Sequence, residues 1–250
     1  MSVNNQYNDE LGALADTLNT MAAKIHQNEK FKNDLISSVS HELRTPLTSI
    51  KGWVVTLHAS VGDNQDMLNE GLEIIDSETD RLTQMVDELL DFSKLDNGRI
   101  QLSCKPVNLQ QLLLHIGKQL TPRAARQSIS LVVEVEETLP IIQADENRLK
   151  QVLINLIDNS LKFTGSGGRI SMYVYSNKQQ VIITVEDTGS GIMEKDLANV
   201  LQKFYKGNSH AAGSGLGLPI SEQIIKLHQG QLFITSVVGE GTKVEIYLPK

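Results

Sequence analysis

The chain has 250 residues, a formal net charge of −7 at pH 7, 40% hydrophobic residues and only 4% aromatic residues. This length allows two or three modules with an ample core. The acidic balance and the scarcity of aromatic side chains exclude the basic grooves and stacking surfaces typical of nucleic-acid-binding proteins. Cys104 is the single cysteine, which excludes an internal disulfide and fits a reducing compartment.

Apolar residues in the first hundred positions recur with helical spacing. The first stripe has the alternating three-and-four spacing of a coiled-coil seam and consists of Leu11, Leu14, Leu18, Met21 and Ile25. Polar residues 26–34 interrupt it, and the stripe resumes from Leu35 to Leu57. The sequence "SVGDN" at 60–64 predicts a turn, and a second stripe then continues to a helix stop at "DNG", 96–98. Since a lone helical hairpin leaves its apolar face uncovered, we expect a dimeric antiparallel four-helix bundle.

The pattern beyond Gly98 changes to short strands and helices. We expect helices over 108–126, 145–163, 194–201 and 217–229. Strands are predicted near 101–105 and over 129–137, 141–144, 168–176, 180–187, 231–236 and 242–248. The alternation indicates an α+β fold in which helices cover one face of a mixed sheet.

The stretch "SSVSHELRTPLTSIKGW", 37–53, places polar side chains on a helix that otherwise reads as a packing element. His41 lies about 200° round the helix from the apolar stripe, with Thr45 one turn later on the same face and Glu42 beside them. Pro46 cannot donate to the carbonyl of Glu42, so a kink is expected there. A solvated polar face with a tolerated proline would explain this stretch equally well if it stood alone.

A second polar row lies on the helix predicted over 145–163. Asn155, Asn159 and Lys162 recur at i, i+4 and i+7, although asparagine is a poor helix former. Amide oxygens suit a hydrated magnesium ion and a lysine suits a phosphate. The row therefore favours a nucleotide or phosphate site over a purely structural helix.

Two glycine-containing segments follow that helix in the chain. "EDTGSGI", 186–192, comes directly after a strand and places Asp187 beside Gly189 and Gly191. "GSGLGL", 213–218, precedes a helix, and its glycines allow backbone N–H groups to approach an anion at the helix N-terminus. Either segment alone could be ordinary turn chemistry, but both together with the asparagine helix are hard to explain as turns.

With these motifs in place, the sequence resembles a sensor histidine kinase of a two-component system. "SHELRTPL" (40–47) resembles the phosphoacceptor box, "NLIDNSLKFT" (155–164) the N box, "DTGSGI" (187–192) the G1 box, "FYK" (204–206) the F box and "GSGLGL" the G2 box. The resemblance implies an ATP-binding domain of the GHKL (Bergerat) type behind the helical bundle. It also implies three domains: a HAMP-like helix at 1–30, a dimerisation and phosphotransfer domain at 31–98 and a catalytic domain at 99–250.

The resemblance assigns roles to the phosphoacceptor box. His41 would accept the γ-phosphoryl group, and Glu42 would hold or deprotonate its imidazole as a general base. Thr45 matches the position that orients water when the partner regulator is dephosphorylated. The resemblance therefore implies a homodimer that phosphorylates an aspartate of a response regulator, with the balance between kinase and phosphatase activity left open.

The resemblance also assigns the nucleotide site, whose cofactors would be ATP and Mg²⁺. Asn159 would coordinate magnesium with support from Asn155, Lys162 would contact phosphate and Asp187 would accept from the adenine amino group. The other implied nucleotide-binding residues come from the glycine boxes and the F box: Gly189, Gly191, Phe204, Lys206, Gly213, Gly215, Leu216 and Gly217.

The sequence departs from the family pattern at three places. Ser160 stands where alanine is usual, and its small size predicts no loss of function. Lys206 replaces the more common arginine, and the lid, 207–212, is short. The HAMP-like part is only half a module, so we expect a piece of a longer membrane receptor, taken from its cytoplasmic side and soluble by itself. A catalytically silent ATP-binding regulatory module is the alternative function.

Overall fold

The computed structural model describes residues 10–59, 65–96, 101–136, 138–205, 207 and 214–250. These residues form two compact units, Met1–Thr83 and Gln84–Lys250, whose boundary falls inside the second helix. The last turns of that helix are therefore part of the second unit.

The first unit is a helical hairpin built from α1 (Glu10–Ala59) and the larger part of α2 (Gln65–Asp96). The two long helices confirm the prediction from the apolar stripes, whereas the turn predicted at 60–64 lies outside the described residues. Helix α1 continues through the polar interruption and through Pro46 without ending. At Gly71 the helices come so close that a Cβ atom would lie 2.9 Å from the Trp53 ring, so glycine permits this contact.

Large apolar side chains of this hairpin remain about half exposed in the single chain. On α1 and α2 they are Leu14, Leu18, Met21, Ile25, Ile36, Leu47, Val54, Val55, Leu68 and Leu72, which are 40% to 60% exposed. A hairpin of two helices has no interior large enough to cover this surface, as the sequence predicts.

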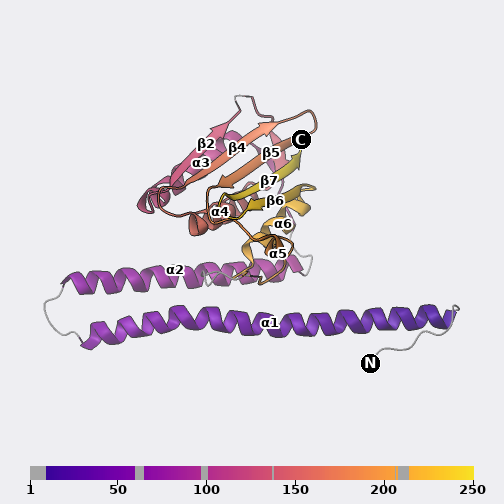
Figure 1. Cartoon of the computed structure of the whole chain (residues 1–250), viewed down its shortest axis with the longest axis horizontal. Helices are drawn as coiled ribbons and strands as arrows, with labels where there is room; N and C mark the ends of the chain where they lie inside the picture. Colours follow the sequence, from indigo (N-terminus) through magenta and orange to yellow (C-terminus); the bar gives the residue numbers. More distant parts are fainter. Residues whose placement is uncertain (1–9, 60–64, 97–100, 137, 206, 208–213) are drawn as a thin grey trace. The chain divides into compact units, whose positions relative to one another are not determined.

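The second unit contains a five-stranded sheet in the order β2-β4-β5-β7-β6, whose strands run from pink to yellow in Figure 1. Strands β2 and β4 pair in parallel and the other pairs are antiparallel. The strand bounds are β2 Ser130–Val135, β4 Arg169–Ser176, β5 Gln180–Asp187, β6 Gln231–Val237 and β7 Gly241–Pro249. A separate antiparallel pair joins β1 (Lys105–Val107) to β3 (Ile142–Ala144).

The helices of this unit are α3 (Leu109–Arg126), α4 (Glu146–Phe163), α5 (Glu194–Leu197) and α6 (Gly217–Leu227). Their apolar faces and alternate strand residues form the core, which confirms the predicted α+β fold. The fully buried side chains include Leu113, Ile116, Leu153, Ile157, Ile170, Met172 and Ile183. The opposite face of the sheet carries exposed residues such as Tyr175 and Phe233.

Capping side chains fix where α3 and α4 begin. The side chain of Asn108 accepts a hydrogen bond from the Gln111 N–H at 3.1 Å, and that of Asp145 accepts from the Arg148 N–H at 3.2 Å. Each bond satisfies a backbone donor that has no partner inside the helix. The start of the helix that carries the asparagine row is therefore set by one local contact.

Two expected elements differ from those observed. The strand predicted near 101–105 is instead Lys105–Val107, because its register is set by pairing with β3, a partner about 37 positions further along the chain that local alternation does not reveal. Helix α5 is shorter than the predicted 194–201, because the backbone bonds beyond it join Asn199 to Asp196 and Gln202 to Asn199, which are tighter i→i−3 turns.

An ion pair between α3 and α4 gives a pH-dependent prediction. Arg123 Nη1 lies 2.6 Å from Asp158 Oδ1, and burial raises the pKa of the Asp158 carboxyl group, although the arginine partly opposes this rise. Replacing Arg123 by Gln removes that opposition and raises the pKa further. We expect Arg123→Gln to lower the free energy of unfolding by about 1 kcal/mol at pH 7.

The loss should shrink toward zero below the ordinary carboxyl pKa, because Asp158 is then protonated in both the folded and the unfolded chain. Urea denaturation at pH 7 and pH 3.5 measures both values. A loss of equal size at the two pH values would contradict this account.

Candidate functional site

The phosphoacceptor candidates lie on α1 in the first unit. His41 is exposed, as predicted from its position away from the apolar stripe. Thr45 is also exposed, and its hydroxyl lies 3.4 Å from the His41 carbonyl oxygen, the bond expected between residues one turn apart. An accessible imidazole and a hydroxyl on the same helix face can both be reached by a reacting group.

The Glu42 carboxylate is directed toward α2. Its Oε2 lies 3.6 Å from Arg81 Nη2, and Arg81 is also 3.6 Å from Glu78 on its own helix. The side chain of Glu42 is only 14% exposed. The structure therefore places Glu42 in an ion pair between the two helices beside His41, a contact that the sequence did not indicate.

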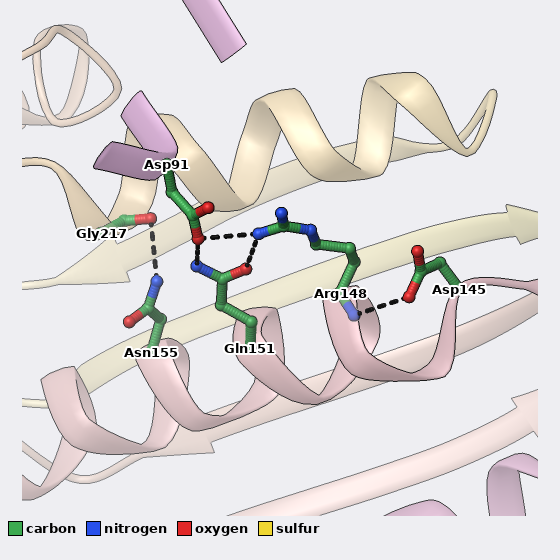
Figure 2. Close-up of polar contacts among 6 residues, drawn as sticks. All are labelled: Asp91, Asp145, Arg148, Gln151, Asn155 and Gly217. Carbon is green, nitrogen blue, oxygen red and sulfur yellow. Dashed lines mark hydrogen bonds and ion pairs between the residues drawn. The ribbon is translucent and has the colours of Figure 1, made fainter. Parts of the chain in front are cut away.

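The nucleotide candidates lie in the second unit, where α4 presents its predicted polar row. Asn155 and Asn159 are half-buried on this helix, and Lys162 is exposed at its end. Figure 2 shows the Asn155 amide nitrogen donating to the Gly217 carbonyl oxygen at 3.4 Å. The N box and the G2 box are thus joined by a hydrogen bond between residues 62 positions apart.

The same helix face continues toward its N-terminus with a network that the sequence did not predict (Figure 2). Arg148 Nη1 lies 2.7 Å from Asp91 Oδ2 and 2.8 Å from Gln151 Oε1, and the Gln151 amide donates to the same Asp91 oxygen at 2.7 Å. The side chains of Arg148 and Asp91 are 24% and 18% exposed. These hydrogen bonds join the last turns of α2 to α4.

Asp187 lies at the end of β5, is 8% exposed and accepts three hydrogen bonds. Its Oδ1 accepts from the backbone N–H groups of Gly189 at 2.9 Å and Thr242 at 3.2 Å. Its Oδ2 accepts from the Ser160 hydroxyl at 2.9 Å. The carboxylate is therefore held from three directions by α4, the G1 loop and β7.

Backbone contacts hold the G1 loop against its neighbours. The Ser190 N–H donates to the carbonyl of Phe163 at the end of α4, and the Ser190 carbonyl accepts from Gly239 in the β6–β7 turn. A Cβ at Gly191, whose φ is +68°, would lie 2.1 Å from the Val237 carbonyl oxygen. Only glycine fits this approach, so the spacing of the G1 box follows from packing.

The F box and the G2 box, which precede and follow residues 207–212 in the sequence, are joined by a hydrogen bond. The Phe204 N–H donates to the Gly215 carbonyl at 3.0 Å, and Gly215 has φ +69°, with no room for a Cβ beside Phe204. Leu216 is fully buried and Gly217 begins α6. Lys206 and Gly213, two further candidates, lie outside the described residues.

Tyr205 in the F box hydrogen-bonds to α5. Its hydroxyl donates to Asp196 Oδ1 at 2.6 Å, and this bond to a carboxylate raises the pKa of the phenol above its ordinary value. The phenol therefore remains a donor throughout the physiological range of pH. The ring of Phe204 also contacts that of Phe92 edge-on, with centroids 5.8 Å apart.

Some residues of the site were missed by reasoning from sequence. Thr242 donates to Asp187 from β7. The two glycines at 239 and 241 could have indicated the turn that precedes it, because glycine is favoured at the positive φ angles that both adopt. Asp91 carried no such signal, since an aspartate near the end of an amphipathic helix is ordinary. In the described part of the chain, no group of three His, Cys, Asp or Glu side chains could hold a metal ion.

Comparison with known families matches two consecutive parts of this chain. Residues 31–98 match the His Kinase A (phospho-acceptor) domain, and residues 144–250 match the histidine kinase-, DNA gyrase B- and HSP90-like ATPase family. The chain belongs to the sensor histidine kinases of two-component systems. This confirms the family resemblance that the five boxes indicated.

Individual relatives of this histidine kinase agree with that assignment. The sensor histidine kinase YclK of Bacillus subtilis is 35% identical over 98% of this chain and 54% of its own. The histidine kinase ThkA, solved in complex with the response regulator protein TrrA, superposes with a TM-score of 0.71 and 26% identity over 90% of this chain and 64% of its own. ShkA, solved with AMPPNP, gives a TM-score of 0.66 and 28% identity over 87% of this chain and 45% of its own.

The chain spans about half the length of YclK and of the E. coli protein BaeS, and about a third of several other curated relatives. Over the residues that the structure describes, every helix is too short or too polar to cross a membrane.

The Asp91 network gives a second prediction. Replacing Asp91 by Asn removes the charge that Arg148 and Gln151 share, and hydrogen bonds to charged groups contribute about 1.5–3 kcal/mol. We expect Asp91→Asn to lower the free energy of unfolding by about 1–2 kcal/mol and to increase amide hydrogen exchange in the last turns of α2.

Asp87, exposed one turn earlier on the same helix, provides the matched control. Asp87→Asn should change the free energy of unfolding by less than about 0.5 kcal/mol. Equal effects of the two substitutions, measured by urea denaturation, would show that the network does not stabilise this contact.

Proposed function

We propose that this chain is the catalytic part of an ATP-dependent protein-histidine kinase that phosphorylates itself on His41. The observation that carries the proposal is the presence, in one chain, of an exposed histidine in a phosphoacceptor box and an ATPase-type domain with an ordered acceptor at Asp187. The phosphoryl group would then pass to an aspartate of a response regulator.

At the nucleotide site, Asp187 would accept from the adenine amino group, since it is a buried carboxylate held by fixed donors. Asn159 would hold a magnesium ion with support from Asn155, because amide oxygens and water are ligands that magnesium prefers. The Asn155 amide nitrogen donates to Gly217, which leaves its oxygen for this role. When bound, the ion would neutralise developing charge on the phosphates. Lys162, exposed at the helix end, would contact phosphate.

The remaining nucleotide candidates would enclose the phosphates. The backbone N–H groups of Gly215 and Gly217 would approach the phosphates, and the Phe204 N–H donates to the Gly215 carbonyl. Lys206 and Gly213 would complete this part of the site, while Gly189 and Gly191 shape the pocket beside Asp187. Phosphoryl transfer depends mainly on positioning and charge neutralisation, which this set can supply.

At the phosphoacceptor, one imidazole nitrogen of His41 would attack the γ-phosphorus as the bond to ADP breaks. Glu42 would take or hold the proton on the other ring nitrogen. In the single chain, this carboxylate is paired with Arg81 of α2. Thr45 would orient a water molecule for dephosphorylation of the regulator.

The proposed partners are a second copy of the chain and a response regulator. The half-exposed apolar side chains of α1 and α2 support a dimeric four-helix bundle, since burying the exposed half of each side chain yields about 1 kcal/mol. The complex of ThkA with TrrA supports a receiver-domain partner. By analogy with the longer relatives, residues 1–30 would link the domains at 31–98 and 99–250 to a membrane sensor through a HAMP-like helix, on the cytoplasmic side.

The silent ATP-binding module remains the alternative, and one labelling experiment separates the two. Incubation with γ-labelled ATP and Mg²⁺ should label the chain, with a label that is stable in alkali and lost in acid, as expected for phosphohistidine. His41→Gln should abolish the label without weakening ATP binding. Asn159→Ala should reduce both labelling and ATP binding at least tenfold.

The chain offers a matched control for each substitution. His58 is exposed on the same helix as His41, and Asn147 is exposed on the same helix as Asn159. His58→Gln and Asn147→Ala should both retain full labelling. ATP binding without any label in the unaltered chain, also in the presence of a response regulator, would favour the silent module.

Thr45 gives a separate prediction about the reverse activity. Thr45→Ala should lower the rate of dephosphorylation of a phosphorylated response regulator at least tenfold, because the water loses its partner, while labelling of His41 stays within twofold. Thr20, which makes the same hydroxyl bond to the carbonyl four residues earlier, is the control. If the Thr20→Ala and Thr45→Ala variants dephosphorylate the response regulator at the same rate, Thr45 does not orient the water molecule.

A further inference from the structure

We infer that Ser160 is a positioning residue for recognition of the base: its hydroxyl orients the Asp187 carboxylate so that one acceptor position remains for the 6-amino group of adenine. This inference rests on the proposed ATP-binding function of the site. It changes the expectation from sequence, which treated Ser160 as a small and neutral replacement for alanine.

The first step is the occupancy of the two carboxylate oxygens. An ionised carboxylate offers about four acceptor positions, two on each oxygen. Oδ1 of Asp187 already accepts from two backbone N–H groups, those of Gly189 and Thr242. Oδ2 accepts from the Ser160 hydroxyl. Within the described residues, this leaves one position on Oδ2 and none on Oδ1.

The second step is the rigidity of these donors. Ser160 is 5% exposed on α4, so its hydroxyl has little solvent to compete for it. Gly189 is buried, and its Cα lies so close to the Phe163 carbonyl that an added Cβ would be 2.7 Å from that oxygen. Gly241, next to Thr242, would place a Cβ 1.8 Å from the Asp187 carbonyl oxygen. The carboxylate is thus fixed by closely packed backbone on one oxygen and by a single side chain on the other.

The third step is the consequence for the base. Because the carboxylate is planar, one rotation about its Cβ–Cγ bond moves both oxygens, and the Ser160 hydroxyl limits this rotation from Oδ2 while the backbone donors limit it from Oδ1. With alanine at position 160, Oδ2 would lose this donor, and the carboxylate would rotate more freely about its Cβ–Cγ bond or take up a water molecule that the base must displace. The amino group of adenine would then meet an acceptor that is no longer held in place.

The test compares two nucleotides in two proteins by isothermal titration calorimetry. ATP carries the 6-amino group, and purine riboside 5′-triphosphate lacks it but keeps the same ring nitrogens and phosphates. We expect Ser160→Ala to raise the Kd for ATP about fivefold and the Kd for the purine analogue less than twofold. The ratio of these two increases in Kd measures the coupling between the Ser160 hydroxyl and the amino group. A merely structural role of Ser160 would raise both Kd values equally and leave this ratio at one.

Ser221 provides the matched control, because it is fully buried and its hydroxyl has no hydrogen-bond partner among the described residues. Ser221→Ala should leave both Kd values within twofold, and circular dichroism of each variant checks that it folds. If Ser160→Ala raises the Kd values of both nucleotides by the same factor, the inference is overturned while ATP binding stays established. Failure of the unaltered protein to bind either nucleotide would overturn the proposed function itself, and this inference with it.

Discussion

Burial of one face of α4 is the constraint on which the nucleotide site depends. Leu149, Val152, Leu153, Leu156 and Ile157 are all 2% exposed or less, so the helix cannot rotate without bringing apolar surface into water. Burial of each such side chain stabilises the folded state by about 1.5–3 kcal/mol. The direction of the opposite, polar row is therefore fixed by the core, and the site needs no separate device to orient its asparagines.

Polar side chains on two faces of α4 contact three other parts of the second unit. Toward its N-terminus, Arg148 and Gln151 hold Asp91 of α2; in the middle, Asn155 meets Gly217 at the start of α6; toward its C-terminus, Ser160 meets Asp187 of β5. The candidate nucleotide residues and the last turns of α2 therefore contact the same helix of the second unit.

The Asp187 carboxylate is fixed by contacts from several parts of the fold. Its donors come from a helix, a loop and a strand that are distant in the sequence, and each is placed by backbone packing or by burial. Glu42 is a second carboxylate with a different environment, since it pairs with Arg81 between two helices. One acidic group is held by three hydrogen bonds in the second unit, and the other lies in an ion pair between the two helices of the first unit.

The sequence alone determined the helices, the strands, the order of the five boxes and the exposure of His41, because these depend on local periodicity and on residue types needed at particular backbone angles. Only the tertiary structure decided the register of β1, the contact of Asp91 with Arg148, the pairing of Glu42 with Arg81 and the bond of Ser160 to Asp187. Each of these joins side chains or strands far apart in the chain, and such distances are set by how the elements pack, which local patterns do not encode.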